Sequence, residues 1–177
     1  MASTLVVNLF GGPGVGKSTL MAATFAKLKW NGYTVEMAPE WAKEQVWERD
    51  LNVMGDQFFV AAQQAHRIER LIGEVDAVIT DSPILLGEIY SNDVALHKYL
   101  HAKFIRYKSI NFLVGREKKF DPKGRLQSLE QAKDLDSKIE DMLQHYLIDY
   151  TKVIGAVSSV DTIVKHVSLR IDSTKDK

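Results

Sequence analysis

Residues 8–19 read NLFGGPGVGKST, which places four glycines and a lysine within seven consecutive positions. Gly11, four further residues, Gly16, Lys17 and Ser18 fit the pattern G-x-x-x-x-G-K-[ST] at every position. Glycines in this pattern let the backbone turn so that successive N–H groups point into one concavity, and the next helix begins with its positive dipole end at the same place. Because both features attract negative charge, the stretch predicts a loop that binds a polyphosphate.

The sequence on either side of the loop favours this interpretation over a glycine-rich surface turn. Residues 4–10 read as a buried parallel strand, and residues 17–32 read as a helix that ends at Gly32. Lys17 is expected to reach the β and γ phosphates of ATP, and the Ser18 hydroxyl to ligate the Mg²⁺ that bridges them. ATP and Mg²⁺ are therefore the expected cofactors. The expected ATP-binding residues are Gly11, Gly12, Pro13, Gly14, Val15, Gly16, Lys17, Ser18 and Thr19, with Lys119 from a later segment.

The composition limits the class of protein. The chain has 177 residues, zero net charge and no cysteine, which favours one domain and excludes disulfides, thiolate metal sites and cysteine nucleophiles. We find no secretory signal and no apolar run long enough to cross a membrane, so we expect a soluble cytoplasmic protein with no membrane partner. We assign residues 1–171 to a single domain and the polar residues 172–177 to a frayed tail.

Strand-like runs alternate with helical periodicity along the chain. The runs are residues 4–10, 33–38, 77–80, 110–114 and 150–154. This alternation predicts a three-layer α/β fold, in which a five-stranded parallel sheet carries helices on both faces. Together with the glycine-rich loop, it indicates the P-loop NTPase fold. Ligands of such sheets bind beyond the carboxyl ends of the strands, so the residues that follow each strand are the first candidates for a site.

Two acids follow strands in this way. Glu40 comes two residues after the run 33–38, and Asp81 directly follows the run 77–80. An Asp at a strand end beside a phosphate loop can hold magnesium through water, and we expect Asp81 to share the metal with Ser18 rather than to cap a helix. Glu40 is a candidate functional residue, with an ordinary surface Glu after a strand as the alternative.

A basic segment follows the fourth strand-like run. From Lys98 to Arg125 the chain has nine Lys and Arg against two acids, a net charge of +7. Phosphoryl transfer develops negative charge that cations stabilise, so we expect a basic lid that closes over the nucleotide rather than a solvated basic turn. The five cations of this lid are Arg116, Lys118, Lys119, Lys123 and Arg125.

Residues 56–71, DQFFVAAQQAHRIERL, read as a helix between the second and third strands. Gln57 and Gln64 are two turns apart on one face, whereas Gln63 and Arg67 share another. Amide groups both donate and accept hydrogen bonds, which suits the edge of a nucleobase. One of the two faces is expected to bind the acceptor, and the sequence leaves open which. The candidate substrate-binding residues, among them an indole that could stack on a base, are Glu40, Trp41, Gln57, Gln63, Gln64 and Arg67.

Three classes of phosphate-loop protein differ in the motifs that accompany the loop. A GTPase carries N-K-x-D and, after the third strand, D-x-x-G, and neither occurs at the corresponding place here. A motor or AAA-type ATPase usually ends its third-strand motif with Asp-Glu, whereas Asp81 is followed by Ser82 and Pro83. A small-molecule or nucleotide kinase needs the loop, an acid near the acceptor hydroxyl, an acceptor-binding helix and a basic lid. The sequence offers all four.

The chain resembles the thymidylate-kinase-like branch of the P-loop nucleoside and nucleotide kinases, in particular small bacteriophage members that are often labelled as AAA ATPases. The resemblance is carried by NLFGGPGVGKST, EWAKE, DQFFVAAQQAHRIERL, VITDSPILL and INFLVGREKKFDPKGR, in that order. It implies that Glu40 acts as the base toward the acceptor hydroxyl and that Arg116 and Arg125 are lid arginines.

The resemblance also bears on the acceptor. Many of these kinases have Asp-Arg after the third strand, whereas this chain has Asp81-Ser82, so Arg67 is the candidate for the arginine contact. Some phage members phosphorylate 5-hydroxymethyluracil within DNA. The resemblance therefore implies modified phage DNA as an acceptor, and the host cytoplasm as the location of a phage-encoded chain.

We therefore expect a Mg²⁺-dependent kinase that transfers the γ-phosphoryl group of ATP to a hydroxyl of a nucleoside, nucleotide or modified base. The best candidate acceptor is 5-hydroxymethyluracil in phage DNA. One alternative is a salvage kinase that acts on a free nucleoside or monophosphate, and another is an ATPase or switch module that acts on a protein partner. The sequence leaves open whether the protein is a monomer or a homodimer. The expected catalytic residues are Lys17, Glu40, Asp81, Arg116 and Arg125.

Overall fold

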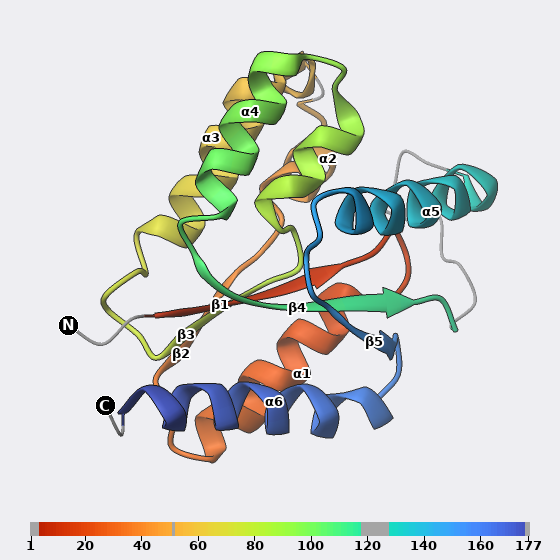
Figure 1. Ribbon diagram of the computed structural model, residues 1–177. Coiled ribbons are helices and arrows are strands. Elements are labelled where there is room, and N and C mark those ends of the chain that lie inside the picture. Colours follow the sequence, from red (N-terminus) through yellow and green to blue (C-terminus); the bar gives the residue numbers. More distant parts are fainter. Residues whose placement is uncertain (1–3, 51, 118–127, 176–177) are drawn as a thin grey trace.

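The computed structural model describes residues 4–50, 52–117 and 128–175 (Figure 1). The strands are β1 (Leu5–Phe10), β2 (Val35–Ala38), β3 (Ala77–Thr80), β4 (Lys108–Gly115) and β5 (Thr151–Ile154). The α-helices are α1 (Lys17–Trp30), α2 (Trp41–Glu48), α3 (Gln57–Glu69), α4 (Val94–Phe104), α5 (Leu129–His145) and α6 (Ser158–Lys175). Two 3-10 segments, η1 (Asn52–Gly55) and η2 (Ile84–Tyr90), complete the described elements.

The strands form one parallel sheet in the order β2-β3-β1-β4-β5. β1 lies at the centre, and all six residues of its LVVNLF segment are buried, as expected of a strand that is covered on both faces. β4 begins two residues earlier than the sequence predicted, because Lys108 and Ser109 already pair with the first residues of β1. The expected five-stranded parallel sheet is confirmed.

Helices cover both faces of the sheet, which gives the expected three layers (Figure 1). On one face, Leu28 of α1 and Ile163 of α6 share a buried cluster with Val7 of β1. On the other face, α3, η2, α4 and α5 form a second cluster, in which Leu85 of η2 packs with Phe10. No helix in the described part of the chain is both long and apolar enough to cross a membrane.

The strand order brings the carboxyl ends of three strands together at one edge of the sheet. From β1 the chain continues to β2 and β3 on one side, whereas β4 and β5 lie on the other side. The register pairs Asn8 of β1 with Thr80 of β3 and pairs Ala38 of β2 with the same Thr80. The carboxyl ends of these three strands are therefore adjacent, and open parallel sheets bind ligands at such a reversal of strand order.

The C-terminal residues differ from the frayed tail expected over 172–177. α6 continues to Lys175, because its last turns have partners elsewhere in the molecule. The Tyr33 hydroxyl donates a hydrogen bond to the Asp172 carboxylate at 3.0 Å, and Lys175 forms an ion pair with Asp76 at 2.8 Å. The polar composition was visible in the sequence, but these distant partners were not. Residues 176–177 lie outside the described residues.

Candidate active site

The loop between β1 and α1 has the backbone geometry that its motif predicts. α1 begins at Lys17, and the N-cap residue Gly16 has a φ of 104° and no side-chain cap hydrogen bond. The first N–H groups of the helix therefore face the loop without a capping side chain, which is the arrangement that binds anions. A side chain at Gly16 would be strained in this conformation, and its Cβ would lie 3.1 Å from the Cα of Gly155.

Gly155 closes the loop from the opposite side. It follows β5, and its backbone N–H donates to the Gly115 carbonyl at 3.1 Å. A Cβ atom at this position would overlap the carbonyl oxygen of Val15, so the chain after β5 can pass this close to the loop only with glycine. The sequence contained no signal for this contact.

The Lys17 side chain is half-buried among carbonyl oxygens of the loop. Its Nζ donates to the carbonyl of Gly11 at 2.5 Å and to that of Gly12 at 3.0 Å. Burial lowers the pKa of Lys17 below its usual value, and the carboxylates of Glu40 and Asp81 oppose this shift. Phosphate oxygens are anionic acceptors, so the same ammonium is well placed to bind them.

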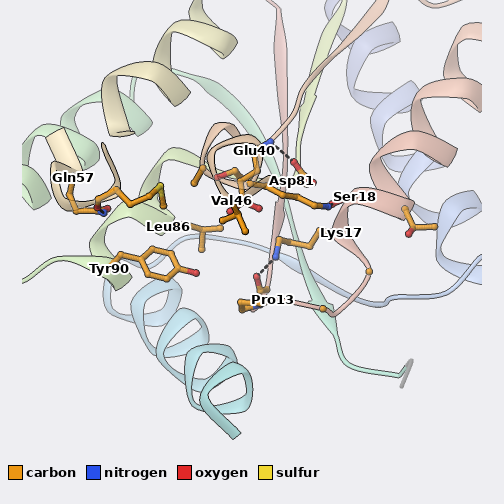
Figure 2. A pocket seen from close by; sticks show the side chains of 17 residues that line it. Pro13, Lys17, Ser18, Glu40, Val46, Gln57, Asp81, Leu86 and Tyr90 are labelled. Atoms are coloured by element: carbon orange, nitrogen blue, oxygen red, sulfur yellow. Dashed lines mark hydrogen bonds between the residues drawn. The ribbon is translucent and has the colours of Figure 1, made fainter. Parts of the chain in front are cut away.

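Asp81 and Glu40 lie next to each other at the ends of β3 and β2. Asp81 is 2% exposed, and its Oδ1 accepts a hydrogen bond from the Glu40 backbone N–H at 3.0 Å. The pairing of Ala38 with Thr80 explains this proximity, because each acid follows one of these paired residues by one or two positions. Both carboxyl-bearing residues line the same cavity as Lys17 (Figure 2).

This cavity has a volume of about 410 Å³ and extends from the loop to η2 (Figure 2). The loop and the first turn of α1 form one end, and α2, η1, α3 and η2 contribute the other. Its size leaves room for a second group beside the phosphates. The lining residues are Gly11, Pro13, Gly14, Gly16, Lys17, Ser18, Thr19, Glu40, Ala42, Lys43, Val46, Met54, Gln57, Asp81, Ser82, Leu86 and Tyr90. Of the expected loop residues, only Gly12 and Val15 are missing from this lining.

The end of the cavity away from the loop combines apolar side chains with one amide and one phenol. Gln57 begins α3, and its Nε2 donates to the Met54 carbonyl at 2.6 Å. The Tyr90 side chain is partly exposed, but desolvation of its hydroxyl, together with the nearby Glu40 carboxylate, raises the pKa of Tyr90 to about 12. The phenol therefore stays protonated at neutral pH and can donate a hydrogen bond. Tyr90 was not among the residues that the sequence singled out.

The oxygen donors at the loop fit a magnesium ion. Ser18 and Asp81 both line the cavity next to Lys17, and Mg²⁺ is usually bound by one or two protein oxygens together with phosphates and waters. The described residues contain no group of three or more His, Cys, Asp or Glu that could hold a metal. The site therefore suits a metal that is bound jointly with a nucleotide.

Sequence reasoning also missed Lys43. This residue of α2 lies three positions after Glu40 and lines the cavity. Its Nζ donates to the Ser18 Oγ at 3.5 Å. The i, i+3 spacing places Lys43 close to Glu40 at the start of the helix, but no motif marked the lysine.

Gln64 and Trp41 do not line the cavity but belong to the framework of the site, and their contact with the acceptor stays a prediction. Gln64 is 5% exposed, its Oε1 accepts from the Trp41 backbone N–H at 3.0 Å, and its Nε2 donates to the Thr80 hydroxyl at 3.3 Å. The Trp41 ring packs edge-on against Phe59. The amide thus connects α2 and α3 to the end of β3.

Arg67 and Gln63 do not line the cavity either. Arg67 pairs with both carboxylate oxygens of Glu44, with Nη1 at 2.8 Å from Oε1, and also donates to the Pro39 carbonyl at 3.4 Å. Its hydrogen bonds hold the pKa of Glu44 below the usual value. Of the two faces of α3, the one that bears Gln57 contributes to the cavity, and the acceptor contact of Arg67 stays a prediction.

Arg116 contacts the phosphate loop from outside the cavity. Its Nη1 donates to the Pro13 carbonyl at 3.0 Å, and its Nη2 pairs with Asp136 of α5 at 2.8 Å. Asp136 also accepts a hydrogen bond at 2.7 Å from a backbone N–H of the loop. Sequence reasoning did not identify Asp136. The rest of the expected basic lid, including Lys119 and Arg125, lies outside the described residues.

Comparison with known proteins agrees with this architecture. The fold is that of P-loop NTPases: the structure of "deoxyadenosine kinase from M. mycoides with bound dATP" is similar to this chain with a TM-score of 0.55 and 15% sequence identity. The similarity covers 94% of this chain and 99% of that chain. Residues 6–159 match the family described as "AAA domain". Because this match includes most of the sequence, the chain belongs to that family. Among curated proteins, no sequence matches the chain.

Proposed function

We propose that the protein is a magnesium-dependent kinase that transfers the γ-phosphoryl group of ATP to a hydroxyl of a nucleoside-type acceptor. The observation that carries this proposal is one cavity with the phosphate loop at one end, Glu40 and Asp81 in between, and Gln57 and Tyr90 at the other end (Figure 2). Hydrolysis of ATP needs room only for a water molecule. A cavity that continues to an amide and a phenol suits a larger acceptor.

In this mechanism the acceptor oxygen attacks the γ-phosphorus while the Glu40 carboxylate accepts the hydroxyl proton. The new oxygen–phosphorus bond forms as the bond to the β-γ bridging oxygen breaks, and its electron pair leaves with ADP. Lys17 offsets the charge of the β and γ phosphates. Magnesium bound at Ser18 and Asp81 would neutralise further phosphate charge.

The first experiment measures transfer of the γ-phosphoryl group directly. The protein is incubated with γ-labelled ATP, magnesium and single nucleosides or monophosphates, and the products are separated. We expect label in one class of acceptor, and ADP release that depends on that acceptor. ATP turnover that is stimulated only by a protein partner, with no phosphorylated product, would instead identify an ATPase or switch module.

Among nucleoside-type acceptors, we propose a free nucleoside or monophosphate as the first candidate. Support comes from the size of the cavity and from the fold, which is similar to that of a deoxyadenosine kinase. Modified phage DNA containing 5-hydroxymethyluracil is the second candidate, and it is supported by the resemblance to phage kinases and by the +7 stretch. Part of that charge has local partners, because Lys103 pairs with Glu69 at 2.5 Å and Lys108 donates to Thr174 at 2.5 Å.

Salt dependence separates these two acceptors. A protein that neutralises DNA phosphates releases counterions, so the logarithm of its affinity falls with the logarithm of salt concentration by about 0.9 per contact. We would offer DNA with 5-hydroxymethyluracil, unmodified DNA and free nucleosides at low and moderate salt. Label that enters only the modified DNA and declines steeply with salt would favour DNA, whereas label in a free nucleoside would favour the salvage reaction.

A further inference from the structure

The cations near the cavity differ in their partners. Arg67 and Arg116 lie outside it, and each is paired with an acid. The cavity itself is lined by two cations, Lys17 and Lys43, within the described part of the chain. Lys17 is bound to loop carbonyls, as the phosphate-loop motif predicts. The sequence motif gives no role to Lys43.

Lys43 is held only weakly where it lies. Its side chain is half-buried, and its hydrogen bond to the Ser18 Oγ is 3.5 Å long, beyond the usual range for N–H···O contacts. None of the ion pairs found between described residues includes Lys43. A half-buried ammonium without a carboxylate partner keeps its capacity to bind an anion.

The charged groups that line the cavity indicate which anion Lys43 binds. A γ-phosphoryl group would enter beside the carboxylates of Glu40 and Asp81, which line the same cavity. Like charges at such short range repel, and cations must offset them. Lys43 contacts Ser18 in the first turn of α1. The Ser18 hydroxyl is the group that is expected to ligate magnesium. A metal on that oxygen would repel the ammonium, and the flexible lysine stem lets it move toward phosphate oxygens.

We propose that Lys43 is a second cation for the γ-phosphoryl group, which it binds in the ATP complex and stabilises during transfer. The stabilisation during transfer rests on the proposed function. The contact with the γ-phosphoryl group in the ATP complex applies to any reaction of ATP at this loop. The opposing explanation is that Lys43 acts only through Glu40, one helical turn away, by favouring the carboxylate form of that base.

The binding experiment compares ADP with a non-hydrolysable ATP analogue, each with magnesium, by titration calorimetry. The variants are Lys43→Met and Lys43→Arg, with Lys98→Met as the matched control, because Lys98 is an exposed cation of α4 outside the cavity. We expect Lys43→Met to weaken binding of the analogue about tenfold or more and binding of ADP by less than about twofold. Lys43→Arg should retain most of the preference for the analogue over ADP, and Lys98→Met should retain all of this preference. An equal effect on both nucleotides, or no effect, would overturn the assignment.

The transfer experiment uses the same variants and the acceptor found above. We expect Lys43→Met to lower kcat about 100-fold with little change in the KM of the acceptor, by analogy with the loss of one oxyanion donor. The acid limb of the pH profile of kcat should lie at the same pH in Lys43→Met as in the wild-type protein. A shift of that limb together with unchanged binding of the analogue would show that Lys43 acts through Glu40, contrary to our proposal.

The two experiments keep this proposal separate from the proposed function. If the wild-type protein phosphorylates no acceptor but Lys43→Met still loses its preference for the analogue over ADP, the kinase function is wrong and the γ-phosphate contact stands. If the wild-type protein transfers phosphate and the variant binds both nucleotides normally, the function stands and the Lys43 assignment is wrong. Thermal unfolding of each variant checks that it is folded, and Lys43→Arg provides the conservative comparison.

Discussion

The two ends of the cavity are constructed in different ways. The phosphate end is formed by neighbouring residues of one loop and one helix turn, and its binding groups include backbone N–H groups. The far end is formed by side chains from α2, η1, α3 and η2, which are separated along the chain. A short motif specifies the first kind of site, whereas tertiary packing assembles the second. The predictions below test whether the two ends also have separate functions.

The largest effect is expected at the phosphate end. Replacement of Lys17 by alanine removes the cation that faces the β and γ phosphates and should lower transfer about 1000-fold, or roughly 4 kcal/mol in barrier height. Circular dichroism and thermal unfolding should show an intact fold. Near-normal turnover by the folded variant would contradict the assignment of the loop.

Glu40 and Asp81 lie between the two ends of the cavity, and their substitutions should impair different steps of the reaction. Glu40→Gln is expected to lower kcat about 100-fold with little change in ATP affinity, because it removes the proton acceptor. Asp81→Asn should raise the magnesium concentration that gives half-maximal activity, because it weakens an oxygen ligand. Titration of activity against magnesium checks both variants. The same magnesium defect in both would show that our division of roles is wrong.

A matched pair of glutamines on α3 tests the boundary between the cavity and its framework. Gln64→Leu should reduce the free energy of unfolding by about 1–3 kcal/mol, because the Trp41 N–H loses its buried acceptor. Gln57→Leu should leave stability nearly unchanged and raise the KM of the acceptor about tenfold. Urea unfolding and steady-state kinetics measure the two quantities. A loss of stability in Gln57→Leu together with a raised acceptor KM in a stable Gln64→Leu would refute the assignment of the two side chains.

The smallest effect is expected at Tyr90. Tyr90→Phe should raise the KM of the acceptor by about threefold to tenfold through loss of one hydrogen bond. The phenol donates only in its protonated form, which is present below its pKa. Since that pKa is raised to about 12, the ratio of wild-type to variant KM should stay constant up to about pH 10. A ratio that rises toward 1 between pH 8 and about pH 10 would contradict this environment for Tyr90.

Much of the fold could be predicted from the sequence because its signals are local. The apolar run of β1, the glycine-rich loop and the start of α1 are consecutive, and the order of strands and helices indicates a parallel sheet. The proximity of Glu40 and Asp81 could be predicted because strand ends of such a sheet share one edge. The expected cytoplasmic location and the choice between monomer and homodimer stay predictions.

The framework contacts could not be read in this way, because their partners are distant in the sequence. Asp136 is 124 positions from the loop residue whose N–H it accepts, and no local pattern distinguishes it from the other acids of α5. Helical spacing correctly placed Gln57 and Gln64 on one face. It could not show that α3 runs from the cavity at Gln57 into the protein interior at Gln64.

The close approach of Gly155 to Val15 also has a consequence for the order of folding. The residues of the phosphate loop leave the ribosome before Gly155, which follows much later in the sequence. Until β5 joins β4, the loop lacks the backbone that lies against Val15 and Gly16. A nascent chain thus contains the complete phosphate-binding motif long before it contains the complete wall of the loop. Nucleotide affinity would therefore report that the last strand of the sheet has docked.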